Sequence, residues 1–158
     1  MTDKGIILKT INPITTFQVC DIKEAPDQTP VIQLKNQQSQ QNVELPGKVL
    51  EAQFAAGNHF LLFVTEGSPF EEALYIYYLD HDLQLVETLE LSAVYAEGML
   101  QNLVMTGSGS MQFSFFDHDE RWTLSVLPKP EYFLLPDKYP VKRKPAFFHQ
   151  RWLKIKKQ

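Results

Sequence analysis

From Val49 to Glu120 the chain contains no lysine and no arginine, although this stretch carries 12 carboxylates. The segment from Lys138 to Gln158 has the opposite balance, with eight cations and no acidic residue. A net charge of −4 therefore hides a strong separation of charge along the sequence. Such a separation can steer a charged partner, or it can hold the basic tail against the acidic middle of the same chain.

Cysteine and long apolar runs are also scarce. The single cysteine, Cys20, excludes an internal disulfide, which fits a reducing cytosol. No stretch approaches the roughly 20 apolar residues that a membrane helix needs. The apolar residues 5–8 are interrupted by Lys9 and are too few for the core of a secretion signal. We therefore expect a cytoplasmic protein without membrane association.

The sequence lacks the common motifs of catalysis and cofactor binding. It contains no phosphate-binding loop, no zinc-protease helix, no Cys-x-x-Cys pair and no Gly-x-Ser-x-Gly elbow. We therefore expect neither a cofactor nor a catalytic function.

The patterns that are present indicate one mainly β domain over residues 1–158, with little helix. Residues 48–127 predict an antiparallel meander, with apolar strands at 48–55, 59–65 and 74–79 separated by turn residues such as Gly57. Meanders of this kind close into a sandwich or a barrel. Between the second and third strands, Ser68, Pro69 and Glu71 have the composition of a helix start, so we expect one helical turn capped by Ser68.

Two flanking segments have unusual compositions. Residues 36–42 are rich in glutamine and predict a mobile loop, because such residues cannot bury a core face. Residues 137–158 are basic and interrupted by proline, and they end in Trp152–Lys156, where apolar and basic residues alternate. This period of two predicts a last strand with Leu153 and Ile155 inward and the lysines outward.

Two aromatic strands are each followed by an Asp-His-Asp turn, at 80–82 and at 117–119. Aspartate and histidine are metal ligands, so the two turns together could supply a metal site. Aspartate is also common in turns, where its side chain bonds the local backbone, and alternating strand residues point apart. We therefore interpret these residues as turn residues and predict no metal site.

For function, the acidic middle of the chain favours a small binding, adaptor or inhibitor-like protein that covers a protein partner of basic character. The basic tail around Lys142–Lys144 could contact nucleic acid, but the overall acidity argues against it. One alternative is a ligand-binding β-barrel with an aromatic pocket lined by the strands 75–78 and 113–116. A second alternative is a metal-dependent hydrolase that uses the Asp-His-Asp turns. The residues predicted to bind the partner are the acidic groups of the meander turns: Glu66, Glu71, Glu72, Asp80, Asp82, Asp117, Asp119 and Glu120.

Overall fold

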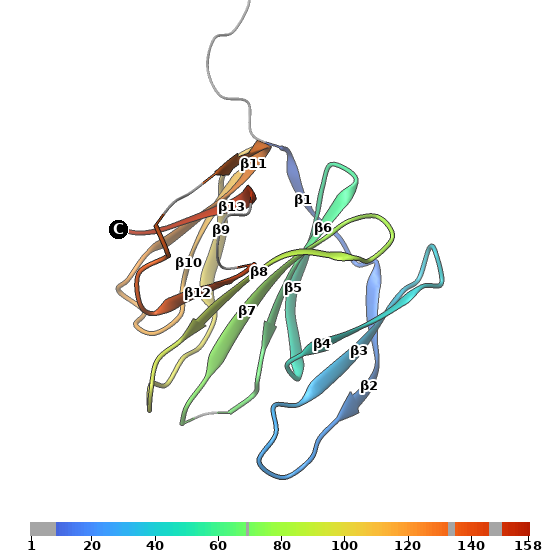
Figure 1. The fold of residues 1–158 in the computed structure, drawn as a ribbon, viewed down its shortest axis with the longest axis horizontal. Helices are drawn as coiled ribbons and strands as arrows, with labels where there is room; N and C mark the ends of the chain where they lie inside the picture. The colour runs from blue at the N-terminus through green and yellow to red at the C-terminus, as the bar shows by residue number, and fades with distance from the viewer. Residues whose placement is uncertain (1–8, 69, 133–134, 146–149) are drawn as a thin grey trace, which may run out of the picture.

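The fold consists of three antiparallel β-sheets stacked as layers (Figure 1). The computed structural model describes residues 9–68, 70–132, 135–145 and 150–158, and these ranges contain thirteen strands and no helix. No helix capable of crossing a membrane occurs among the described residues. The prediction of a mainly β sandwich or barrel is confirmed as a sandwich, because the described sheets stay open and form no closed barrel.

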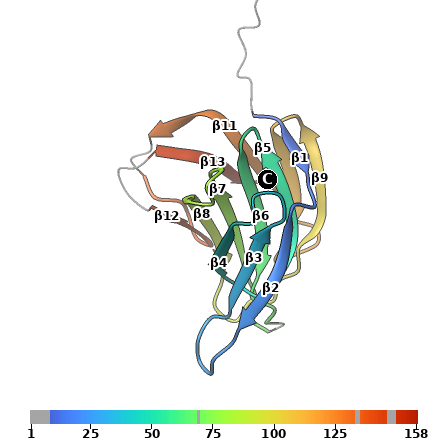
Figure 2. The same cartoon turned by 90° about the vertical axis from the view of Figure 1, so that its right-hand side faces the viewer.

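The central sheet has six strands in the order β1-β5-β6-β7-β8-β12. Their bounds are β1 Ile11–Pro13, β5 Val49–Ala56, β6 His59–Thr65, β7 Ala73–Leu79, β8 Leu85–Ser92 and β12 Val141–Lys144. A four-stranded sheet has the order β13-β11-β10-β9, with β9 Gln101–Gly107, β10 Ser110–Ser114, β11 Trp122–Tyr132 and β13 Gln150–Lys157. A three-stranded sheet contains β2 Phe17–Lys23, β3 Val31–Asn36 and β4 Asn42–Pro46. Figure 2 shows the three-stranded sheet extending from one end of the molecule.

Each face of the central sheet contributes to a separate hydrophobic core. On one face, Phe63, Ile76 and Leu89 pack with Phe113 and Leu124 of the four-stranded sheet. On the other face, residues of β6 and β7 pack with Phe17, Ile32 and Leu34 of the three-stranded sheet. Strand β7 is consequently buried along its whole length. Burial on both faces explains why β7 reads as the continuous apolar run Leu74–Leu79 instead of an alternating pattern.

The predicted hairpins are confirmed. Strands β5 and β6 pair across the turn at Gly57, whose φ of +62° suits a residue without a Cβ. The two similar hairpins of the sequence become β7–β8 in the central sheet and β10–β11 in the four-stranded sheet that covers it. The glutamine-rich residues 36–42 form the β3–β4 turn, where the Asn36 side chain accepts the N–H groups of Gln38 and Ser39 at 2.9 and 3.1 Å.

The prediction of a helical turn capped by Ser68 is wrong. Phe70 and Glu71 form a bend, no helix occurs among the described residues, and Pro69 lies outside them. The carboxylate that organises this loop belongs to Glu72 instead of Glu71. It accepts the backbone N–H groups of Glu66, Gly67 and Ala73 at 2.9, 3.1 and 3.0 Å. One buried carboxylate therefore accepts three backbone donors at the two ends of this loop.

The basic tail packs into the fold as two strands. Strand β12 forms an edge of the central sheet beside β8, and β13 forms an edge of the four-stranded sheet beside β11. The alternation predicted for the last strand is confirmed, because Leu153 is buried, Ile155 is half-buried, and Lys154 and Lys156 are exposed.

A buried network of ion pairs joins these tail strands to β8. The Arg143 guanidinium donates to Glu87 at 2.9 Å, to the Asp137 carboxylate at 2.8 and 3.1 Å, and to the Leu153 carbonyl at 2.8 Å. Glu87 also accepts two backbone N–H groups of β13, at 2.9 and 2.8 Å. Arg151 lies 3.6 Å from Asp137 and donates to the carbonyl of residue 135 at 2.7 Å. This network links β8, β12 and β13 through polar groups that are withdrawn from water.

Candidate functional site

The three-stranded sheet packs against only part of one face of the central sheet. The second core contains side chains of β6 and β7 but no side chain of β8 or β12 among the described residues. Register places two cross-strand rows on this open face: Tyr75–Glu90–Lys142 and Tyr77–Thr88–Lys144. Directly opposite side chains in antiparallel strands lie about 5 Å apart, so each row runs from a buried tyrosine of the core to an exposed lysine of β12.

The two tyrosines of these rows form the boundary between core and open face. Their rings stack at a centroid distance of 5.8 Å with an interplanar angle of 10°. The Tyr75 hydroxyl donates to the Glu66 carboxylate, and the Tyr77 hydroxyl donates to the Pro46 carbonyl at 2.6 Å. Burial raises the pKa of both phenols, so both remain protonated donors at neutral pH. The hydroxyls therefore fix the position of Glu66 and of the neighbouring three-stranded sheet.

At one end of these rows the surface is hollowed into an acidic groove. Its volume is about 360 Å³, and its lining includes four glutamates with a single cation, Lys142. We call these four residues the acidic groove: Glu66, Glu71, Glu72 and Glu90. Glu90 lies 3.8 Å from Lys142, and burial raises the pKa of Glu72 above its ordinary value. The groove thus brings together carboxyl groups from β8 and from the β6–β7 loop.

Large apolar side chains are exposed around the same end. Val94 and Tyr139 line the groove with exposures of 70% and 71%, and Phe70 in the β6–β7 loop is 78% exposed. The backbone N–H of Glu72 donates to the Ala96 carbonyl at 3.0 Å, which holds the β8–β9 loop against the β6–β7 loop. Exposed aromatic groups beside charged groups are typical of surfaces that bind proteins.

The structure divides the eight acidic residues predicted to bind a partner. Glu66, Glu71 and Glu72 meet in the groove, and Glu90 joins them although the sequence did not single it out. Asp80 and Asp82 follow the opposite end of β7, about 20 Å away along a seven-residue strand. The remaining three, Asp117, Asp119 and Glu120, belong to the β10–β11 connection. No local sequence pattern singles out Glu90, because only the pairing of β8 with Tyr75 and Lys142 places it beside the groove.

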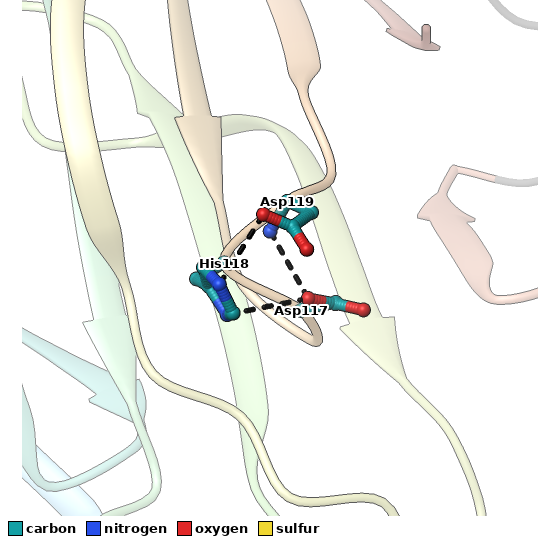
Figure 3. Close-up of side chains that lie close together, drawn as sticks. All are labelled: Asp117, His118 and Asp119. Atoms are coloured by element: carbon teal, nitrogen blue, oxygen red, sulfur yellow. Dashed lines mark hydrogen bonds and ion pairs between the residues drawn. The ribbon is translucent and has the colours of Figure 1, made fainter.

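Both Asp-His-Asp segments are turns, as predicted. The Asp80 side chain accepts the N–H groups of Asp82 and Gln84, both at 2.9 Å. In the second turn, the Asp117 side chain accepts the N–H of Asp119 at 3.0 Å (Figure 3). Each leading aspartate thus closes its own turn through the backbone, which is the usual reason for aspartate at such positions.

Ligand atoms of Asp117, His118 and Asp119 lie within 4.8 Å of one another, and all three residues are exposed. The Asp80–Asp82 turn does not join this group among the described residues. We expect the purified protein to contain no stoichiometric zinc or manganese, because exposed carboxylates in a turn are well hydrated and no buried ligand supports them. Elemental analysis tests this. Stoichiometric metal that disappears in a His81→Ala/His118→Ala variant would contradict the prediction.

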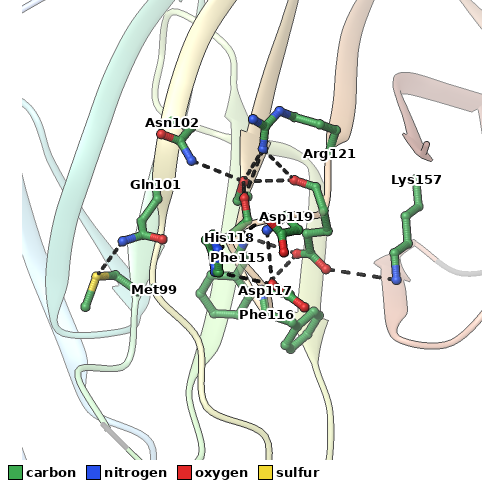
Figure 4. Close-up of polar contacts among 12 residues, drawn as sticks. Met99, Gln101, Asn102, Phe115, Phe116, Asp117, His118, Asp119, Arg121 and Lys157 are labelled. Atoms are coloured by element: carbon green, nitrogen blue, oxygen red, sulfur yellow. Dashed lines mark hydrogen bonds and ion pairs between the residues drawn. The ribbon is translucent and has the colours of Figure 1, made fainter.

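Glu120 has a structural role in the same connection. Its carboxylate accepts the N–H groups of Phe115 and Phe116 at 3.0 and 2.8 Å and the indole N–H of Trp122 at 2.7 Å. Figure 4 shows Arg121 and Lys157 on either side of this turn. Arg121 donates to the Ser114 hydroxyl at 2.9 Å, and Lys157 lies 4.0 Å from Glu120. Glu120 is therefore occupied within its own chain.

Of the aromatic strands of the barrel alternative, β7 lines a hollow of about 200 Å³ through Tyr75 and Tyr77, together with Thr88, Lys142 and Lys144. Tyr77, Tyr78 and Phe113 are almost completely buried and belong to the two packed cores. The acidic groove and the exposed apolar groups around it are consequently the strongest candidate surface for function. Comparisons of the chain with protein-family models, with curated proteins and with solved structures found no match.

Proposed function

We propose that this chain is a non-catalytic binding protein that holds a basic protein partner in the acidic groove. The observation that carries the proposal is the gathering of Glu66, Glu71 and Glu90 in one hollow beside exposed Val94 and Tyr139. Apolar contacts at such a surface supply affinity, and the carboxylates select cationic side chains and accelerate association. The exposed free thiol of Cys20 supports a place in the reducing cytosol.

Two carboxylates of the groove are already held in fixed positions by hydrogen bonds within the chain. Glu72 is fixed by three backbone donors, and Glu66 is fixed by the Tyr75 hydroxyl. Fixed side chains lose little conformational entropy on binding, so more of the contact energy contributes to affinity. Glu71 is exposed and makes no hydrogen bond to the described residues, which leaves its carboxylate available to a partner.

A variant that neutralises three carboxylates of the groove, Glu66→Gln/Glu71→Gln/Glu90→Gln, tests the proposal. We expect it to lose capture of a basic partner from the native cell extract, measured by quantitative mass spectrometry at about 50 mM and about 500 mM salt. Capture by the wild type should fall at the higher salt, because exposed charges are screened.

The matched control removes three exposed carboxylates outside the groove, as Asp82→Asn/Asp119→Asn/Glu131→Gln. It should retain the partner, since the total charge change is the same and only the position differs. Equal loss in both variants would show that the partner responds to net charge alone. A captured partner that is acidic, or binding that ignores salt, would also contradict the proposal.

A further inference from the structure

A second hollow lies between the edges of two sheets, where β12 of the central sheet runs near β13 of the four-stranded sheet (Figure 1). Its volume is about 450 Å³. The Arg143–Leu153 hydrogen bond of 2.8 Å holds the two edge strands together beside it. We call it the basic cleft, and its lining combines three lysines, Lys138, Lys156 and Lys157, with the apolar or aromatic side chains of Trp122, Val141 and Ile155.

The positive charge of the basic cleft is poorly compensated. The one carboxylate in its lining, Asp137, already accepts two hydrogen bonds from Arg143 and lies 3.6 Å from Arg151. The Lys157 ammonium lies 4.0 Å from Glu120, whose carboxylate already accepts three N–H groups, and 5.9 Å from the centroid of the Trp122 ring. Lys138 and Lys156 form no ion pair with any residue that the structure describes. Three lysines thus contribute to the lining of one hollow in a protein whose net charge is −4.

The inner surface of the basic cleft is apolar and fixed. Trp122 is 3% exposed, its indole N–H is held by Glu120 at 2.7 Å, and Val141 is 7% exposed. Hollows of about 300–1,000 Å³ with mainly apolar walls and a few placed charges are typical of small-molecule sites. The cleft therefore has room for a ring against the half-buried Ile155, beside the edge of Trp122, and lysines in its lining for a negative group.

The structure assigns to the basic cleft a binding site for a small ligand that carries one anionic group on an apolar ring. This site is separate from the acidic groove and selects the opposite charge. Of the residues that the structure describes, Tyr139 alone lines both hollows, so an occupied cleft would lie next to the surface that holds the protein partner.

Phenyl phosphate is the probe that tests this assignment. The chain has two tryptophans, so a Trp152→Phe variant identifies the indole N–H signal of Trp122 in a ¹⁵N NMR spectrum. We expect saturable shifts of that signal in the full-length protein at up to about 10 mM probe. Inorganic phosphate, which lacks the ring, and benzyl alcohol, which lacks the charge, should each bind at least about tenfold more weakly, since each offers only half of the contacts.

Three sets of variants locate the site. Lys138→Gln/Lys156→Gln/Lys157→Gln should weaken phenyl phosphate binding by about tenfold or more, because each lysine contributes a favourable charge interaction. The corresponding arginine variant should restore it. Removal of three lysines elsewhere, Lys23→Gln/Lys35→Gln/Lys129→Gln, should leave it unchanged. Absence of saturable shifts, binding of benzyl alcohol equal to that of phenyl phosphate, or equal weakening by the two glutamine variants would each overturn the assignment.

Discussion

Replacing Arg143 by methionine is expected to destabilise the protein by about 3–5 kcal/mol, the cost of breaking a buried ion pair by removing one partner. The Arg143 side chain is 4% exposed and that of Glu87 is 1% exposed. Methionine fills most of the volume but donates no hydrogen bond. The variant therefore leaves the carboxylates of Glu87 and Asp137 buried without the guanidinium that neutralises both.

Chemical denaturation followed by tryptophan fluorescence measures this loss. Lys144→Met is the matched control, because Lys144 follows Arg143 on the same strand but is exposed. It should change stability by less than about 0.5 kcal/mol. Arg143→Lys should give an intermediate loss, since an ammonium keeps the charge but cannot make the paired contacts with Asp137. A loss below about 1 kcal/mol for Arg143→Met would contradict the role of the network.

The salt dependence of the same variant separates two explanations of the charge asymmetry. If the basic tail neutralised the acidic middle through exposed pairs, the loss would shrink as salt is raised toward 1 M, where the Debye length is about 3 Å. Among the described residues, one buried ion pair joins the tail to the middle, Glu87–Arg143. Two longer pairs join them at the surface, Glu90–Lys142 at 3.8 Å and Glu120–Lys157 at 4.0 Å. We therefore expect a loss for Arg143→Met that hardly changes with salt.

This division of the tail also bears on the proposed function. The Arg143 guanidinium is bound within the fold by Glu87, Asp137 and the Leu153 carbonyl. By contrast, four lysines of the tail form no ion pair with the described residues: Lys138, Lys144, Lys154 and Lys156. Likewise, the Glu87 carboxylate is buried and paired with Arg143, whereas Glu71 is exposed. The separation of charge in the sequence thus serves the fold through one buried contact, and most of the remaining charge stays on the surface, where partners and ligands can meet it.

The strands and hairpins of the meander were predictable because their signals are local. The alternation of apolar and basic residues in Trp152–Lys156 predicts which side of β13 faces the core, and the turn residue Gly57 predicts the β5–β6 hairpin. Aspartate leading each Asp-His-Asp turn is likewise a local signal, since its side chain bonds a backbone group two residues ahead. Such features depend on a few neighbouring residues and survive in any fold that contains them.

The functional surface was less predictable because it depends on pairing between distant strands. Glu71 and Glu72 are adjacent and chemically identical, yet Glu71 is exposed while Glu72 is buried on three backbone donors. Glu90 enters the groove only because β8 pairs with both β7 and β12. A charge count along the sequence also cannot show that Asp80 and Asp82 follow the end of β7 that is remote from the groove.

Glu120→Ala is the second substitution with a large expected effect, a destabilisation of about 3 kcal/mol. A buried donor left without an acceptor costs about 1–3 kcal/mol. The Glu120 carboxylate serves three donors, of which the N–H of Phe115 and the indole N–H of Trp122 are buried. Both aromatic residues belong to the core between the central and four-stranded sheets, so loss of this acceptor disturbs the packing of two layers at once.

The neighbouring residue provides the control. Asp119→Ala removes the same charge one position earlier, but its carboxylate is exposed, so the change should cost less than about 0.5 kcal/mol. Glu120→Gln keeps an oxygen acceptor in place and should lose less than Glu120→Ala. Denaturation midpoints of the three variants give their stabilities. A separate capture experiment with the folded Glu120→Gln variant tests whether this carboxylate also contacts the partner. Stability of Glu120→Ala equal to that of Asp119→Ala would show that the three donors find other acceptors. Reduced capture by Glu120→Gln would show that Glu120 also contacts the partner, as the sequence predicted.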